Sequence, residues 1–154
     1  MTIEITNAPR VLGLSRSLIQ RALQNVLESE GQGERIVCVC FVMDARMRAL
    51  HRQYKGVDRS TDVLAFGMQE GVGRGISPEV LGDIVVSSET AAREARARRL
   101  PVRRELLLYA VHGVLHLLGY RDGTARDARV MHRLERAYLR AVAPRSRAAR
   151  ARRS

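Results

Sequence analysis

Residues 112–122 read HGVLHLLGYRD, which places His112 and His116 four residues apart in an apolar segment. In a helix the two histidines would project from one face, one turn apart and about 6 Å along the axis. Gly119 follows where a helix can end in a left-handed turn, which glycine adopts at little cost. The reversal can bring Asp122 back over the same face. Two imidazoles and one carboxylate converging on a point predict a catalytic zinc centre with its fourth position open.

The residues between these candidate ligands indicate which reactions the centre could perform. Neutral imidazoles and a carboxylate suit Zn²⁺, and the carboxylate admits harder ions such as Mn²⁺. The same spacing occurs in zinc proteases, which need a glutamate directly after the first histidine as general base. Gly113 occupies that position here and cannot take up a proton. The sequence therefore argues against peptide hydrolysis by that mechanism. His51 and His132 lack such a context, and we assign them no metal role.

Length and composition predict one soluble domain. The chain has 154 residues, of which 45% are hydrophobic, enough for a substantial core. No apolar run reaches the roughly 18 residues that span a membrane, and Met1-Thr2-Ile3-Glu4 lacks the basic start of a signal peptide. We expect a cytoplasmic protein with its domain at 1–143. Residues 144–154 hold five arginines and predict a disordered tail, either a polyanion-binding arm or a solvated end.

The charge of the chain favours a polyanionic partner such as RNA. The net charge is +11, and 26 of the 27 basic residues are arginine. Charge alone does not separate RNA from DNA or an anionic membrane surface. Aromatic residues make up 4% of the chain and there is no Trp, which argues against a large base-stacking platform. Candidates for an electrostatic RNA track, or for a merely solvated helix face, are Arg93, Arg96, Arg99 and Arg103.

Cys38 and Cys40 are the two cysteines of the chain. On a strand both would point to one face, which is poor geometry for a mutual disulfide. They could form half of a zinc site, or they could be two small apolar residues in a buried strand. The second interpretation is favoured because no second half-site accompanies them.

The apolar pattern predicts an α+β fold with about four strands in a mixed sheet and more helices than strands. The expected strands are Thr2–Thr6, Arg35–Met43, Asp62–Met68 and Leu81–Ser87. The expected helices are Ser15–Glu30 with Ser15 as N-cap, Asp44–Tyr54 with Asp44 as N-cap, Ser88–Leu100, a helix from Pro101 that carries the histidines, and Ala125–Val142. Gln69–Pro78 is glycine-rich and predicts a hairpin or loop.

Three motifs resemble the YbeY family of bacterial rRNA-maturation endoribonucleases. The family pattern His-Gly-x-Leu-His-Leu-x-Gly-Tyr-Asp-His matches from His112 through Tyr120. Tyr54–Phe66 looks like the family's Tyr-Arg-Gly-x-Asp-x-x-Thr-Asp-Val-Leu-Ser-Phe, and Leu81–Ser87 is similar to its Gly-Asp strand. The resemblance implies a mixed α/β fold, one zinc ion and single-strand-directed RNA cleavage in late rRNA processing, at the 3′ end of small-subunit rRNA. It also implies rRNA, the small ribosomal subunit and assembly proteins as partners, and no DNA.

The chain departs from the family pattern at two positions. Counted position by position, Asp122 replaces the family's third histidine as ligand, and such a His₂-carboxylate set still serves zinc hydrolases. If Arg121 is instead an insertion, Asp122 is the family's aspartate and no third ligand remains. The first alignment is preferred because it keeps the spacing. Lys55 stands where the family has an arginine, and it carries the charge without a bidentate grip on phosphate.

The mechanism implied by the resemblance is metal-assisted phosphodiester cleavage, in which Lys55 is the catalytic candidate that offsets developing negative charge. No residue is marked as the general base by sequence alone. Tyr54, Asp62 and Asp83 are expected to support the loop and strands. The alternatives are a non-catalytic RNA-binding or ribosome-assembly factor with a structural zinc, and a metal-dependent hydrolase of a non-RNA substrate.

Overall fold

A four-stranded mixed sheet forms one layer of the molecule, and helices cover it. The computed structural model describes residues 2–67 and 79–142. The strands are β1 (Ile3–Thr6), β2 (Ile36–Val42), β3 (Val63–Gly67) and β4 (Val80–Ser87), and the helices are α1 (Arg16–Ser29), α2 (Asp44–Lys55), α3 (Ser88–Arg98), α4 (Val102–Leu117) and α5 (Ala125–Val142). The predicted α+β fold is confirmed, and the ends of the elements lie within about two residues of those expected. The predicted loop at Gln69–Pro78 and the tail at 144–154 lie outside the described residues.

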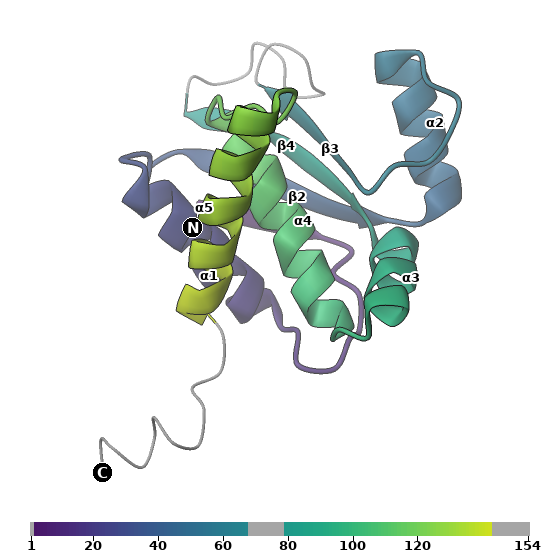
Figure 1. Ribbon diagram of the computed structural model, residues 1–154, viewed down its shortest axis with the longest axis horizontal. Coiled ribbons are helices and arrows are strands. Elements are labelled where there is room, and N and C mark those ends of the chain that lie inside the picture. Colours follow the sequence, from purple (N-terminus) through teal and green to yellow (C-terminus); the bar gives the residue numbers. More distant parts are fainter. Residues whose placement is uncertain (1, 68–78, 143–154) are drawn as a thin grey trace.

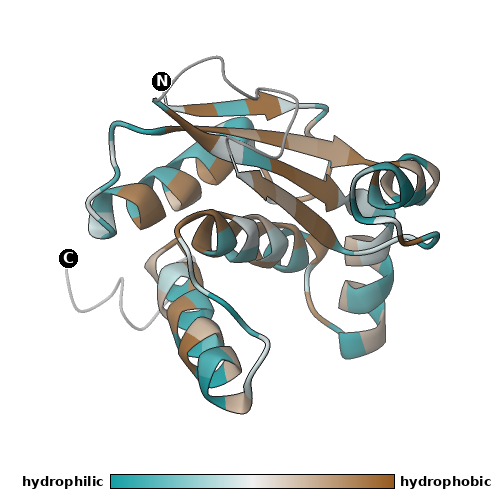
Figure 2. Ribbon diagram, turned by 90° about the horizontal axis from the view of Figure 1, so that it is seen from above, coloured by the Kyte–Doolittle hydropathy of each residue, from teal (hydrophilic) through white to brown (hydrophobic). Residues whose placement is uncertain are grey.

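The strand order is β1-β2-β4-β3 (Figure 1). β1, β2 and β4 run parallel, and β3 pairs antiparallel with β4 at the edge of the sheet. The helix α4 packs against β3 and β4, with α1 and α5 beside it on the same side of the sheet. This arrangement sets the histidine-bearing helix next to the edge strand β3 (Figure 2).

Buried and less buried side chains alternate along the strands, and this alternation determines which face of the sheet is covered. Val37, Val39 and Phe41 of β2 are buried in the main core with residues of α1 and α4, and Ile84 of β4 joins them. The other side has a smaller cluster under α2, around Met47. The period-two pattern thus gives the sheet one fully covered face and one partly covered face.

Gly113 allows α4 to approach the sheet closely. A Cβ at this position would lie 2.7 Å from Cγ2 of Ile84, closer than real Cβ atoms approach a neighbour. Gly113 is buried. The glycine that stands where zinc proteases have their glutamate base is therefore also the contact point between α4 and β4. This close contact fixes the height of His112 above the sheet.

Ser15 caps α1 as predicted, because its Oγ accepts a hydrogen bond from the backbone N–H of Leu18 at 3.0 Å. The prediction that Asp44 caps the second helix is wrong. Met43 is the N-cap of α2 and makes no side-chain cap hydrogen bond, while Asp44 is the first helical residue. The Asp44 carboxylate accepts hydrogen bonds from Ser87, Thr90, Ser60 and Arg93 instead. A side chain with four donors from other segments is held away from its own helix terminus.

Cys38 and Cys40 point to the same face of β2, as predicted, and both thiols are free. They lie half-buried on the less covered face of β2, a strand inside the sheet whose Val37, Val39 and Phe41 are fully buried on the other face. Burial and the neighbouring Glu4 raise the pKa of Cys38 to about 12, which keeps the thiol protonated. Among the described residues, the one metal-binding group found does not include the cysteines.

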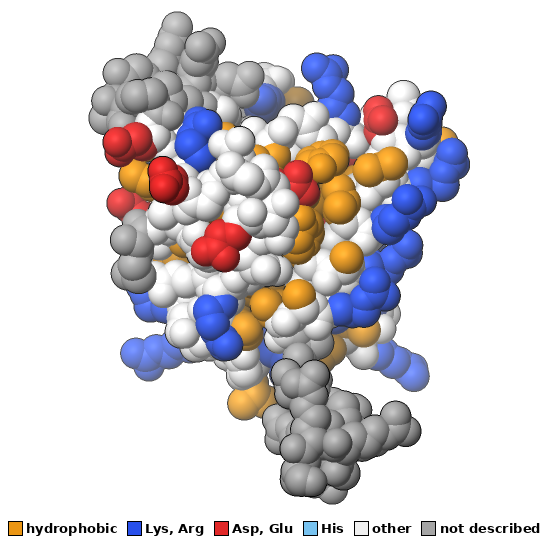
Figure 3. All heavy atoms as spheres, turned by 90° about the vertical axis from the view of Figure 1, so that its left-hand side faces the viewer, with side chains coloured by type: hydrophobic (Ala, Val, Ile, Leu, Met, Phe, Trp, Pro, Cys, Tyr) orange, Lys and Arg blue, Asp and Glu red, His pale blue; other side chains and the backbone are white. Residues whose placement is uncertain are grey.

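Many basic side chains are exposed on the surface of the molecule (Figure 3). Figure 3 shows a column of Lys and Arg side chains down the right-hand edge of the face it presents, with few acidic side chains beside it. None of the described helices is both long enough and apolar enough to cross a membrane.

Candidate metal centre

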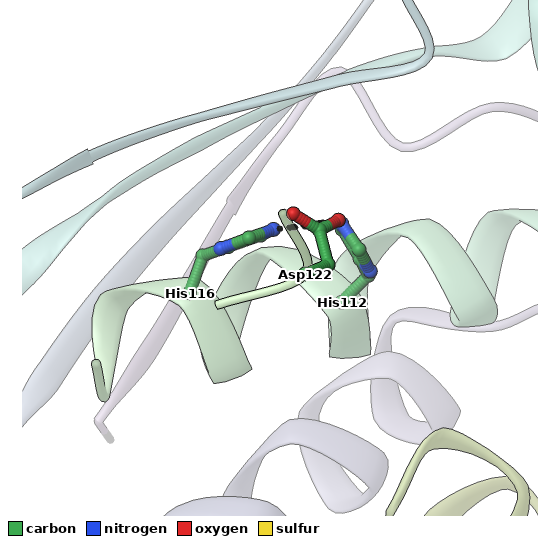
Figure 4. A group of neighbouring side chains, drawn as sticks. All are labelled: His112, His116 and Asp122. Atoms are coloured by element: carbon green, nitrogen blue, oxygen red, sulfur yellow. Dashed lines mark hydrogen bonds and ion pairs between the residues drawn. The ribbon is translucent and has the colours of Figure 1, made fainter. Parts of the chain in front are cut away.

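His112, His116 and Asp122 converge at the end of α4. The two imidazoles project from the same side of the helix, and the Asp122 carboxylate lies between their tips (Figure 4). The chain reverses at Gly119, which has a φ of 102° as predicted for a left-handed turn. The backbone N–H of Tyr120 donates to the carbonyl of Leu115 at 3.0 Å and closes this turn. The geometry therefore supports the alignment in which Asp122 takes the position of the third ligand.

The distances between the three donor atoms fit a small divalent ion. Oδ2 of Asp122 lies 3.5 Å from Nε2 of His112 and 3.4 Å from Nε2 of His116. Ligands about 2.0–2.1 Å from a tetrahedral zinc lie about 3.3–3.4 Å apart. The two Nε2 atoms are closer, at 2.9 Å. Two nitrogens and one carboxylate oxygen on a half-exposed surface could hold such an ion and leave one position free.

Glu135 of α5 is the partner that orients His112. Its Oε1 lies 2.7 Å from Nδ1 of His112, and the carboxylate is buried, with 5% of the residue exposed. A proton on Nδ1 donated to Glu135 leaves the Nε2 lone pair directed at Asp122 and His116. Burial lowers the pKa of His112, but the hydrogen bond and charge of Glu135 and the charge of Asp122 outweigh it and raise this pKa above its ordinary value.

Neither Glu135 nor His132 was predicted from the sequence to belong to the site. His132, one turn before Glu135, has its Nδ1 3.4 Å from Oε2 of that carboxylate. The available signal was an acid at a core position, since Met131, Glu135 and Leu139 are the buried residues of α5. A buried carboxylate in a helical stripe needs a partner, and the structure shows that this partner is His112 of α4.

Two tyrosines tie the ligand loop to α1. The hydroxyl of Tyr120, two residues before Asp122, donates to the Glu30 carboxylate at 3.0 Å. The hydroxyl of Tyr138 on α5 donates to the same carboxylate at 2.9 Å. Glu30 is the residue at the C-terminal end of α1, so one carboxylate holds the loop, α1 and α5 together. This network fixes the path of the chain that carries Asp122.

A polar groove extends from His112 toward α3. Its lining includes Asp62, Tyr109, His132 and Glu135, the basic residues Arg59, Arg93 and Arg98, and the acidic Glu94, which pairs with Arg98 at 3.7 Å. Arg93 is also bound to the Asp44 carboxylate, which fixes its position. The groove therefore joins the candidate metal centre to a wall that carries both basic and acidic side chains.

Lys55 lines a second pocket together with His116, Tyr120 and Arg121. Its Nζ is 5.7 Å from the centroid of the Phe66 ring, and Tyr54 packs edge-on against the same ring. Asp62 accepts a hydrogen bond from the backbone N–H of Val63 and supports the start of β3. Asp83, by contrast, lies in β4 opposite Phe66 and Cys38 and lines neither pocket.

The four arginines predicted as an RNA track are not brought together. Arg93 lines the groove, whereas Arg96 and Arg99 are exposed and do not line it. Arg103 is half-buried and lies against Gly13, in a different pocket beside Leu139. Arg59 and Arg98, which are not among these four, also line the groove, and Arg98 lies on the same arginine-rich helix as Arg93.

The fold and this cluster define an α+β protein with a candidate metal centre between two polar pockets. A sequence model described as endoribonuclease YbeY matches residues 5–143. The endoribonuclease YbeY of Pelotomaculum thermopropionicum is 46% identical over 125 residues, which cover 79% of this chain and 82% of that protein. The one from an Anaeromyxobacter species is 42% identical over 142 residues, covering 92% and 72%.

A solution structure from Thermotoga maritima is similar over 91% of this chain and 88% of that one, with a TM-score of 0.60 and 28% identity. These findings agree with the resemblance noted in the sequence, and the chain belongs to the YbeY family of endoribonucleases. Membership in this family supports a nuclease that acts on RNA.

Proposed function

We propose that this protein is a metal-dependent endoribonuclease that cuts single-stranded RNA, with Zn²⁺ as the ion and Mn²⁺ as a possible substitute. The observation that carries the proposal is the convergence of His112, His116 and Asp122, with Glu135 holding His112 in the tautomer that frees Nε2. A divalent ion at this point would polarise a phosphate oxygen or make a water molecule more acidic. Since the Asp122 carboxylate would reduce the net positive charge of the site, that water would be less acidic than at a three-histidine site.

The residues around the centre supply the rest of the mechanism. Lys55, on the His116 side, offsets negative charge that builds on the scissile phosphate. On the His112 side, Arg59, Arg93 and Arg98 bind neighbouring phosphates and hold the strand across the centre. One pocket is lined by His112 and the other by His116, so a single strand lying across the centre would contact both pockets.

The substrate we propose is ribosomal RNA, and the step is late processing at the 3′ end of small-subunit rRNA. This part rests on family membership together with the net charge of +11, which suits a polyanionic substrate. The expected partners are the small ribosomal subunit and its assembly proteins, in the cytoplasm. The proposed domain spans 1–143, with 144–154 as a basic tail.

The test combines metal analysis with RNA cleavage. Purified protein should contain one equivalent of metal and should cut single-stranded rRNA fragments but not duplexes. His116→Ala should lose both the metal and the cleavage, while His51→Ala, a histidine outside the group, should keep the metal. Equal cleavage by His116→Ala and the wild type would assign the activity to another site. The product ends identify the nucleophile, since a 2′,3′-cyclic phosphate indicates the 2′-hydroxyl and a 5′-phosphate indicates water.

The competing function is a non-catalytic RNA-binding assembly factor with a structural zinc. Structural zinc sites fill all four positions with protein ligands. The group found among the described residues offers three donors, which favours catalysis. Binding of rRNA with bound zinc and without any cleavage would favour the assembly factor instead.

A further inference from the structure

Five arginines form a continuous stripe along the outer face of α5. They are Arg126, Arg129, Arg133, Arg136 and Arg140, spaced alternately three and four residues apart, and all five are exposed. At about 100° per residue they fall within a sector of roughly 80°, and the row is about 21 Å long. We call this row the α5 arginine stripe. Its regular spacing places five positive charges in a straight line on one rigid element.

The stripe has no counter-charge within the part of the chain that the structure describes. None of the five guanidinium groups forms an ion pair with a described acidic residue. The opposite face of the helix is buried through Met131, Glu135 and Leu139, so the stripe is held pointing outward. The right-hand edge of Figure 3, the side on which α5 lies, shows basic side chains in a column. A row of unscreened like charges repels itself and needs an anionic partner to be favourable.

We propose that the α5 arginine stripe binds the phosphate backbone of a double-helical segment of the RNA substrate. The proposal rests on the proposed function only in taking RNA as the substrate. The stripe offers charge and no aromatic surface, because Tyr138, the aromatic residue of α5, is hydrogen-bonded to Glu30 on the inner side. Single strands gain much of their affinity from base stacking, which this surface does not provide. Double-stranded RNA is recognised through shape and phosphate contacts, which a straight row of arginines matches.

The stripe adjoins the groove of the candidate metal centre. Arg129, His132 and Arg136 follow one another at i, i+3 and i+7 and therefore share one row of the helix surface. His132 lines the groove that leads to His112. The helix α5 thus carries the groove on one side and the duplex-binding row next to it. An RNA with a helix directly beside a single-stranded segment would contact both, whereas an unstructured strand would contact the groove alone.

The test compares Arg133→Gln/Arg136→Gln with the matched control Arg10→Gln/Arg46→Gln. The control removes the same charge from two exposed arginines that lie outside α5 and form no ion pair with a described acidic residue. Binding is measured for a hairpin RNA with a single-stranded extension and for an unstructured RNA of equal length, over a range of salt concentrations. Both variants should fold, because each replaces exposed side chains and glutamine is a good helix former at Arg46, Arg133 and Arg136; circular dichroism checks this.

The stripe variant should bind the hairpin RNA roughly 10- to 50-fold more weakly than the wild type at 0.1 M salt, with a salt slope shallower by about 1 to 2. Its affinity for the unstructured RNA and the affinities of the control should change by less than about threefold. Equal losses in the two variants, or equal losses for the two RNAs, would overturn the proposal. Tighter binding of anionic phospholipid vesicles than of hairpin RNA, lost in the stripe variant alone, would also overturn it. Cleavage by the wild type reports separately on the proposed function, because the stripe is judged by binding.

Discussion

Replacement of Glu135 should weaken metal binding while the protein stays folded. Its carboxylate lies 2.7 Å from Nδ1 of His112, and a hydrogen bond donated by the Nδ1–H group would fix the tautomer and make Nε2 a better ligand. Loss of such an outer partner lowers metal affinity by about 10- to 100-fold, or about 1.4 to 2.7 kcal/mol. Glu135→Gln keeps an acceptor oxygen and should fall near the tenfold end. Glu135→Leu leaves a half-buried N–H without its partner and should fall near the hundredfold end.

The loss should depend on pH in a defined direction. Glu135 raises the pKa of His112, so the wild-type imidazole is more often protonated near pH 6 and must lose that proton to bind a metal. The substitutions remove this competition together with the positioning. The difference in affinity between variant and wild type should therefore be larger at pH 8 than at pH 6.

Titration of metal-free protein with zinc against a chromogenic chelator measures the affinity directly. The control is His132→Ala, which removes a contact to the same carboxylate at 3.4 Å from an exposed histidine. It should change zinc affinity by less than about threefold, since it leaves the hydrogen bond of His112 in place. Folded Glu135→Leu with wild-type zinc affinity at pH 8 would refute the role of His112 as a ligand through Nε2.

Four further outcomes follow from the geometry. Asp122→Ala should lower zinc affinity at least tenfold and Asp122→His should restore it, which the same chelator titration would show. Gly113→Ala should lower the free energy of unfolding by about 1 to 3 kcal/mol in urea melts, because its Cβ meets Ile84. The pKa of Asp44 is about 2 against an ordinary 3.8, since its hydrogen bonds outweigh burial, so Asp44→Asn should cost about 2 kcal/mol at pH 7 and progressively less as pH falls toward 2. Chelation should abolish cleavage yet change RNA affinity less than about threefold in gel-shift assays.

The part of the site that sequence predicts is the part encoded within one helix and its end. His112 and His116 had to share a face if the segment was helical, and Gly119 marked where the chain could turn back. Their convergence with Asp122 needed no knowledge of the rest of the fold. The same holds for the sheet, because Val37, Val39 and Phe41 alternate with less buried residues along β2.

What the sequence could not predict depends on which segments meet in space. Glu135 lies 23 residues from His112, and its role appears only when α5 packs on α4. Asp44 seemed suited to a helix cap by local rules, but donors from β4, α3 and the loop before β3 outcompeted its own helix terminus. Arg93 was rightly placed on an exposed helix, yet only the fold shows that it faces the groove while Arg96 does not.

The charges around the centre indicate that binding and chemistry are carried by different residues. The two positive charges of a divalent ion would be balanced by two carboxylates, because Asp122 lies between the histidines and Glu135 contacts His112. The centre as a whole is then nearly neutral and attracts a phosphodiester only weakly. The attraction would then come from the α5 arginine stripe and from Arg59, Arg93 and Arg98 in the groove, although Asp44 and Glu94 partly offset the last two. A chain with a net charge of +11 could therefore use Asp122 as a ligand in place of a third histidine and still hold a polyanionic substrate.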